Sequence, residues 1–367
     1  MPFPSKPILL LIATCLVTCT REDGLERPSN ENNDVRAAAE PPMPGPRRGR
    51  LLQAVRDNDE CVVCHDEQAR EWRGSMHQRA DVDAAYRHAF AIEPTAFCRG
   101  CHAPEGDPER DAPAHVSEIG VACVTCHVTE EGAILAAPAT NFDPAPHPLR
   151  RSAVFAASGG CVNCHEFPFP GPRLIGDDAD GSFMQTTIRE HARSGASDTS
   201  CAACHMPVVA GHRSHSFAQV RDPEWLRKNL VVEAKQSAFG GAEITLRQVK
   251  PGHGFPTGDL FRRLEVGAEL RDTDGRVVRR DVRYLARQFV ERPHRGGREL
   301  SEDDRVFDEP VVIDLDIAPS SKFARKLEVV SWVKLQRVAT VGTGFNSHEA
   351  EVESEVELYR GVLAWQP

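Results

Sequence analysis

Aromatic side chains and long apolar runs are both scarce in this 367-residue chain. Phe, Trp and Tyr make up 6% of the residues, and the only sustained apolar segment lies near the N-terminus. A protein with several membrane-spanning helices is therefore excluded. The formal net charge of -10 argues against nucleic acid as a partner, because phosphate backbones select basic surfaces. The low aromatic content suggests that another kind of group fills part of the interior.

The cysteines follow one repeated pattern. Two of the twelve, Cys15 and Cys19, belong to the N-terminal apolar segment. The other ten form five Cys-x-x-Cys pairs, and a histidine follows each pair directly. The five units are Cys61, Cys64 and His65; Cys98, Cys101 and His102; Cys123, Cys126 and His127; Cys161, Cys164 and His165; and Cys201, Cys204 and His205.

This spacing is the attachment signature of haem c. Two thiols three positions apart can form thioethers with the two vinyl groups of one porphyrin, and the following imidazole becomes the proximal iron ligand. Paired Cys-x-x-Cys units also build structural zinc sites, but zinc does not require histidine after every pair. A disulfide scaffold is excluded because every cysteine after residue 19 belongs to a motif. We therefore predict five covalent haem c groups.

The N-terminus predicts export. Residues 1–19 combine Lys6 with an apolar stretch from Ile8 to Val17, which is typical of a secretory signal peptide and short for a bilayer span. Leu16-Val17-Thr18-Cys19 also resembles a lipoprotein cleavage box, so Cys19 is a candidate lipid anchor, with cleavage to a soluble protein as the alternative. We expect a location in the periplasm or at the outer-membrane surface.

Three further regions are distinguished by composition. Residues 20–50 are rich in Pro, Gly and charge and predict a disordered linker. Residues 51–227 contain all five motifs, with short helices expected at 81–92 and 183–192 between Pro- and Gly-rich loops. This pattern predicts a mainly α, otherwise irregular multihaem cytochrome c domain, in which the haems serve as the core.

Residues 228–367 contain no haem motif and predict an antiparallel β-sandwich domain. Apolar and polar residues alternate there with period two. The expected strands are 243–247, 264–270, 311–317, 326–335 and 351–359. Asp272-Thr273-Asp274-Gly275 is typical of a hairpin turn between two of them.

The remaining histidines are candidates for the sixth iron ligand. A haem with two imidazoles is closed and suits electron transfer, whereas a haem with one is open to a ligand. Ten histidines lie outside the motifs: His77, His88, His115, His147, His191, His212, His215, His253, His294 and His348.

Four of these histidines are the preferred ligands. His77 follows the first motif by one helical stretch and cannot easily reach its own haem, while His147 lies between two prolines that hold it extended. His215 follows the fifth motif, with His212 as its alternative. His253 lies in the loop Pro251-Gly-His-Gly-Phe-Pro-Thr-Gly258, whose glycines allow close approach of a flat group and would dock the β domain onto the haem domain.

The other histidines are expected to be ordinary solvated side chains. This interpretation applies to His88, His115 and His191, and to His294 and His348 in charged loops. About four sixth ligands for five irons leave one haem as a candidate open site.

Several motif contexts resemble a known family. Trp72-x-x-Ser75-x-His77, Cys-His-Ala-Pro, Gly-Val-x-Cys-x-x-Cys-His-Val and Cys-His-Met-Pro are similar to multihaem cytochromes c related to the tetrahaem acceptor of hydroxylamine oxidoreductase. The resemblance covers residues 61–217. The Gly-His-Gly-Phe-Pro-Thr-Gly loop looks like one in β domains fused to such cytochromes.

The resemblance carries ligand assignments. It implies His77 on the haem of His127, His147 on the haem of His65, and an open haem at His102. Five motifs here replace four in those relatives. We infer the last two pairings ourselves, as His215 with His165, and either His253 or His191 with His205.

An electron carrier without catalytic residues is the favoured function, acting with redox partner proteins. The alternative is a multihaem oxidoreductase acting on nitrite or hydroxylamine at one five-coordinate haem. Pentahaem nitrite reductases replace one haem histidine by lysine, but no lysine occurs here between Lys6 and Lys228. Tyr86, the only tyrosine of the haem domain, could pack beside the second haem, although core packing is expected. As a third possibility, the β domain is a module that docks a redox partner.

Overall fold

The computed structural model describes residues 43–138, 145–169, 182–217, 221–238, 240–291, 298–319, 327–339 and 350–365. The expected signal peptide, most of the expected linker, Cys19, His294 and His348 lie outside these residues. Glu40–Pro367 forms one compact unit. None of the described helices is long and apolar enough to cross a membrane.

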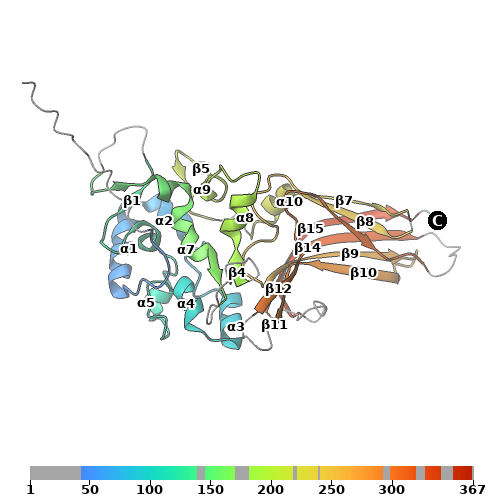
Figure 1. The fold of residues 1–367 in the computed structure, drawn as a ribbon, viewed down its shortest axis with the longest axis horizontal. Helices are drawn as coiled ribbons and strands as arrows, with labels where there is room; N and C mark the ends of the chain where they lie inside the picture. The colour runs from blue at the N-terminus through green and yellow to red at the C-terminus, as the bar shows by residue number, and fades with distance from the viewer. Residues whose placement is uncertain are drawn as a thin grey trace, which may run out of the picture. The chain divides into compact units, whose positions relative to one another are not determined.

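Short helices dominate the first half (blue to green in Figure 1). They are α1 (Leu52–Cys64), α2 (Asp66–Trp72), α3 (Ala84–Ile92), α4 (Ala96–His102), α5 (Ala114–Ser117), α6 (Cys123–His127), the π-helix η1 (Phe155–Gly159), α7 (Gly160–His165), α8 (Thr187–Arg193), α9 (Cys201–His205) and α10 (Pro223–Asn229). Each Cys-x-x-Cys-His unit therefore lies at the C-terminal end of a short helix. The motif histidine is the last helical residue in four of them, and His65 directly follows α1. Side chains set two of the starts: Asp83 accepts the Tyr86 N–H, and Thr95 accepts the Phe97 N–H.

Small strand pairs connect these helices. They are β1 (Leu135–Ala136) with β2 (Arg150–Arg151), β3 (Glu166–Pro168) with β4 (Phe183–Thr186), and β5 (Val208–Val209) with β6 (His212–Arg213). The helix expected over 183–192 is thus wrong in its first half. Phe183–Thr186 pairs with β3, placing Phe167 opposite Gln185, and the helix begins only at Thr187. The helix expected from residue 81 begins at Ala84.

Antiparallel strands dominate the second half, as predicted. They are β7 (Leu230–Gln236), β8 (Ala242–Gln248), β9 (Arg262–Arg271), β10 (Val277–Leu285), β11 (Arg287–Glu291), β12 (Arg298–Asp303), β13 (Val311–Leu315), β14 (Glu328–Val338) and β15 (Val352–Ala364). One sheet has the order β10-β9-β14-β15, a second has the order β13-β8-β7, and β11 pairs with β12. Asp272–Gly275 forms the expected turn between β9 and β10, where Gly275 has a φ of 76°.

The apolar core is unevenly distributed between the two halves. In the strand region, one cluster joins both larger sheets, with Ile244 and Leu246 from β8 against Val266 and Leu270 from β9. In the helical region, the buried cluster is small and centres on Trp72 and Val124. This contrast agrees with the expectation that a group other than side chains completes the helical half.

Candidate haem-binding site

A single large cavity runs through the helical half and reaches loops of the strand region. Its volume is about 2420 Å³, well above the roughly 300–1,000 Å³ of a usual small-molecule site. All ten motif cysteines and all five motif histidines line it. The ten thiols are free of disulfides. The residues present therefore fit several covalently attached flat groups in one enclosed space.

The described residues do not favour the zinc alternative. No group of three or more His, Cys, Asp or Glu side chains among them has the arrangement of a metal site. The Cys-x-x-Cys pairs consequently do not converge into the four-ligand sets of structural zinc.

Cysteines of different motifs lie next to each other across the cavity. Cys101 contacts Cys164, and Cys161 contacts Cys201, so the second, fourth and fifth motifs are neighbours. Burial, and then the nearby Cys61, raise the pKa of the Cys123 thiol to about 12, which places the first motif beside the third. The nearby Cys126 of the third motif contributes to raising the thiol pKa of both Cys161 and Cys164 in the fourth. The five motifs thus form one connected array.

Four motif histidines each face a second histidine. The ring-centre separations are 6.2 Å for His65 and His147, 6.3 Å for His127 and His215, 6.1 Å for His165 and His77, and 6.0 Å for His205 and His253. Two imidazoles bound on opposite sides of one metal ion through nitrogens at about 2.0–2.1 Å would have ring centres about 6.3 Å apart. The four pairs match this requirement.

Two of the expected pairings agree with these positions. His147 lies opposite His65, and His253, rather than His191, lies closest to His205 among the ring contacts of that motif. His191 also lines the cavity, but the described residues place no histidine ring directly opposite it.

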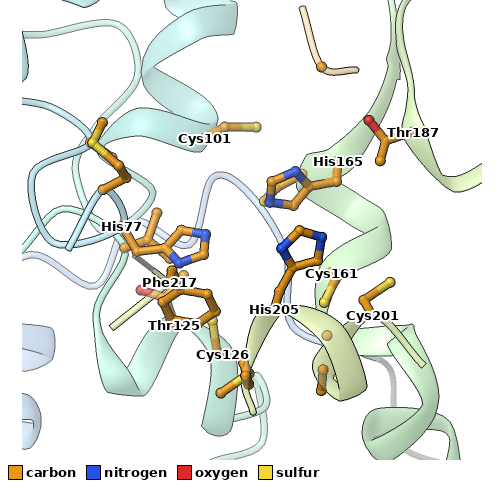
Figure 2. Close-up of a pocket in the computed structure, with 18 of the residues that line it drawn as sticks. His77, Cys101, Thr125, Cys126, Cys161, His165, Thr187, Cys201, His205 and Phe217 are labelled. Carbon is orange, nitrogen blue, oxygen red and sulfur yellow. The ribbon is translucent and has the colours of Figure 1, made fainter. Parts of the chain in front are cut away.

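The two other pairings are exchanged and correct the expectation. His77 lies opposite His165 instead of His127, and His215 lies opposite His127 instead of His165. A backbone contact fixes the position of the His77 segment. Val121 N donates to the His77 carbonyl at 2.8 Å, which holds the His77 segment against the turn before the third motif. Figure 2 shows the His77 ring across from the rings of His165 and His205.

Backbone carbonyls orient several of these rings. In four histidines Nδ1 lies within hydrogen-bond distance of a backbone carbonyl oxygen. The pairs are His102 with Ala80 at 2.7 Å, His127 with Leu135 at 3.0 Å, His215 with Arg213 at 2.8 Å, and His253 with Gly254 at 3.0 Å. A proton on Nδ1 satisfies each carbonyl and leaves the Nε2 lone pair free for a metal.

Burial also keeps the rings neutral, which is the form that binds iron. The enclosed position of His77 lowers its pKa to about 3, with further contributions from His165 and His205. Burial and the neighbouring His253 lower the pKa of His205 to about 4. Neither ring carries a proton charge near pH 7.

The second motif differs from the others. Among the described residues no histidine ring lies against His102; instead Tyr86 stacks on it at 3.7 Å, with 6° between the planes. The Tyr86 side chain is buried and lines the cavity, and its hydroxyl has no hydrogen-bond partner there. The expectation of plain core packing was therefore incomplete, because Tyr86 packs directly beside this motif.

The remaining candidates lie away from the cavity. His212 Nε2 lies 3.1 Å from Glu71 Oε1, and His88 Nδ1 lies 2.7 Å from Glu353 Oε1. His115 is exposed. Glu71 also accepts the His215 N–H at 2.8 Å and so fixes the segment that presents His215.

Sequence reasoning missed the residues that hold His253 in place. Glu190 of α8 accepts the Gly254 N–H at 3.1 Å, the Thr257 hydroxyl at 2.8 Å and Arg305 Nη2 at 2.7 Å. Side chains of Glu190 and Arg305 are 7% and 3% exposed, so this ion pair is a buried link between the two halves. The glycine-rich loop was a signal for this contact, but nothing in the local sequence marks Glu190 as its partner.

Comparisons with known proteins agree with the motifs. Residues 60–128 match the family model "Cytochrome c554 and c-prime". The fold is similar to that of a penta-heme cytochrome c552 from Thermochromatium tepidum, with a TM-score of 0.62 and 20% identity over 87% of this chain and 100% of that one. A β-glucuronidase of glycoside hydrolase family 2 covers 37% of this chain and 11% of its own, with 16% identity and a TM-score of 0.16 that supports no conclusion. No curated protein matches. Together, the motifs, the cavity and the family match support a multihaem c-type cytochrome, and the structural comparison shows a similar fold.

Proposed function

We propose that the chain carries electrons through five covalently bound haem c groups outside the cytoplasm. The observation that supports this most directly is the single cavity lined by all ten motif thiols and by four opposed histidine pairs. When bound, each haem iron supplies a one-electron couple whose potential depends on its axial ligands and exposure.

In this proposal the protein's own residues supply attachment, ligation and enclosure. The cysteines would hold the porphyrins, and the histidine pairs that would ligate the irons are His65 with His147, His127 with His215, His165 with His77, and His205 with His253. Carbonyl bonds to Nδ1 fix ring orientation. The cysteines that lie near one another indicate which motifs are neighbours. The sequence of neighbours is first, third, fourth and fifth motif, and the second motif lies beside the fourth.

Location and partners are part of the proposal. The signal-like segment 1–19 and the requirement for thioether formation support export to the periplasm or outer-membrane surface, with Cys19 as a candidate lipid anchor. The acidic chain favours a basic redox partner, since complementary charge accelerates encounter. We interpret the strand region, whose two larger sheets share a core, as a β-sandwich.

The second motif supports a second candidate function. His102 lacks an opposing imidazole among the described residues. A five-coordinate iron there would allow an oxidoreductase acting on a small nitrogen species such as nitrite or hydroxylamine. This alternative requires an open iron at only one of the five haem sites, and the other four could still transfer electrons.

Spectroscopy of the holoprotein tests both candidates. Intact mass and haem-to-protein ratio measure attachment, low-temperature EPR of the oxidised form counts low-spin irons, and carbon monoxide titration of the reduced form counts open ones. We expect five haems, four of them low-spin and one that binds gas. A colourless protein with the bare polypeptide mass would overturn the proposal. Five low-spin irons with no gas binding would exclude the second candidate alone.

A further inference from the structure

Arg262, the first residue of β9, lies on the cavity wall contributed by the strand region. Its side chain has exposed surface, yet desolvation by the surrounding protein lowers its pKa. Both facts agree if the exposed surface faces the internal cavity. Gly258, with a φ of 110°, leaves room for the guanidinium, because a Cβ there would lie 3.3 Å from Arg262 Cζ.

Among the described residues, the Arg262 guanidinium forms no ion pair with a carboxylate. Within the described part of the chain its hydrogen bonding is limited to a long contact from Nη1 to Thr257 O at 3.4 Å. The neighbouring carboxylates lie within ion-pair distance of other arginines: Asp259 Oδ2 lies 3.7 Å from Arg337 Nη1, and Asp83 Oδ2 lies 3.5 Å from Arg221 Nη1. Asp259 attracts Arg262 as well, but it is shared between the two arginines. A guanidinium carries five N–H donors, so most of them point at nothing in the polypeptide.

An enclosed cation with unused donors is costly unless an anion meets it. The charges that act on Arg262 are the attractive Asp259 and the repulsive Arg337 and Arg221. The Thr257 segment that contacts Arg262 also reaches the fourth motif, because Thr257 Oγ1 lies 2.9 Å from Thr187 Oγ1. Gln185 Nε2 in turn lies 3.4 Å from Thr187 Oγ1 and 3.3 Å from His165 Nδ1. The missing anion therefore lies between β9 and the fourth motif.

We propose that Arg262 binds a propionate carboxylate of the haem attached at Cys161 and Cys164. This inference rests on the proposed function, since it requires that haem to be present. A guanidinium and a carboxylate form two parallel charge-assisted hydrogen bonds, which matches the fork of donors that Arg262 presents to the cavity. The strand region would then contact the haem array at two points, through Arg262 at a propionate and through His253 at an iron.

The test compares three full-length holoproteins with the unsubstituted one: Arg262→Gln, Arg262→Lys and, as the control, Arg247→Gln. Arg247 lies on β8, is exposed and does not line the cavity. Covalent haem content is measured first by intact mass. Spectroelectrochemical titration over a range of pH then gives the individual midpoint potentials and their pH dependence.

We expect five haems in every variant and a change confined to one redox couple in Arg262→Gln. Loss of the cation raises the pKa of the bound carboxylate, so this couple gains pH dependence. Its potential falls above neutral pH, because the oxidised haem is no longer disfavoured by the positive charge. Arg262→Lys keeps the charge and should show a smaller shift, and Arg247→Gln should show none.

Three results would overturn the inference. One is an unchanged set of potentials and pH dependences in Arg262→Gln with five haems attached. Another is an equal shift in Arg247→Gln. The third is a saturable spectral response to sodium nitrite in the unsubstituted protein that disappears in Arg262→Gln while all potentials stay the same, which would assign Arg262 to a free oxyanion. Absence of covalent haem in the unsubstituted protein would instead be a failure of the proposed function, and the mass measurement detects it first.

Discussion

Tyr86 and His102 lie in parallel planes, 6° apart, with their ring centres separated by 3.7 Å. The His102 ring is therefore held between an aromatic face and the Ala80 carbonyl, 2.7 Å from its Nδ1. His127 also has a carbonyl beside its Nδ1, from Leu135, but its ring faces His215, whereas among the described residues no imidazole faces His102. The second motif is thus fixed from one side only, and this asymmetry leads to the first prediction.

Carbon monoxide should bind the reduced protein at the haem of the second motif. Replacing both Cys98 and Cys101 by Ala removes that haem, so gas binding should disappear while the low-spin EPR signals remain. The matched control replaces Cys61 and Cys64, whose haem has an opposing imidazole in His147, and should retain gas binding. Gas binding that survives loss of the second motif would place the open iron elsewhere.

The exchanged histidine pairing can be tested by combining substitutions. His77→Ala should open one additional haem to carbon monoxide, because it removes one imidazole of the pair with His165. Adding Cys161→Ala and Cys164→Ala should abolish that increment. Adding Cys123→Ala and Cys126→Ala instead should leave it. The reverse outcome would restore the pairing that the family resemblance implies.

Glu190→Gln should destabilise the protein at neutral pH. Burial opposes ionisation of this carboxyl, but the charge and hydrogen bonds of Arg305, with Thr186 and Thr257, lower its pKa to about 2. A depression of this size corresponds to roughly 3 kcal/mol. The contribution is present above the ordinary carboxyl pKa and is lost as pH falls toward 2.

Unfolding by denaturant at several pH values measures this effect. The free energy of unfolding of Glu190→Gln should lie below that of the natural protein at pH 7, and the two curves should converge in acid. Glu109→Gln, at an exposed position, is the control and should follow the natural protein throughout. A constant difference at all pH values would assign the loss to packing rather than to charge.

Substitutions of Tyr86 should separate the contribution of its ring to stability from that of its hydroxyl. The hydroxyl is buried without a partner in the described structure, so Tyr86→Phe should change stability by no more than about 1 kcal/mol. Tyr86→Ala removes the stacked ring and should cost roughly 3–5 kcal/mol. Thermal unfolding of the two variants gives the comparison, and a large loss in Tyr86→Phe would reveal a hydroxyl partner.

Local patterns predicted much of this molecule. Each Cys-x-x-Cys-His unit is set by contiguous residues, so the five units could be recognised without knowledge of the rest of the chain. The short helices that carry them were not predicted. The alternation in β8, where Ile244 and Leu246 are buried and Arg247 is exposed, is likewise a property of a single strand.

Contacts between distant segments were beyond sequence reasoning. The strand Phe183–Thr186 has a composition compatible with a helix, and only pairing with β3 decides its conformation. His77 and His215 each lie opposite a motif histidine, and the segments that present them are held by distant contacts with Val121 and Glu71. No sequence pattern marks Arg262, since its significance lies in its position on the cavity wall and in the absence of an ion pair with it among the described residues.

The loop that contains His253 gives the array an internal reporter. His253 belongs to the strand region and His205 to the helical region, and the Glu190–Arg305 link holds that loop in register. On the proposed function, separation of the two regions would remove one imidazole from the haem iron of the fifth motif and change its absorption spectrum. A redox partner that displaces the strand region would then change the spectrum and the electron-transfer rate of that haem together.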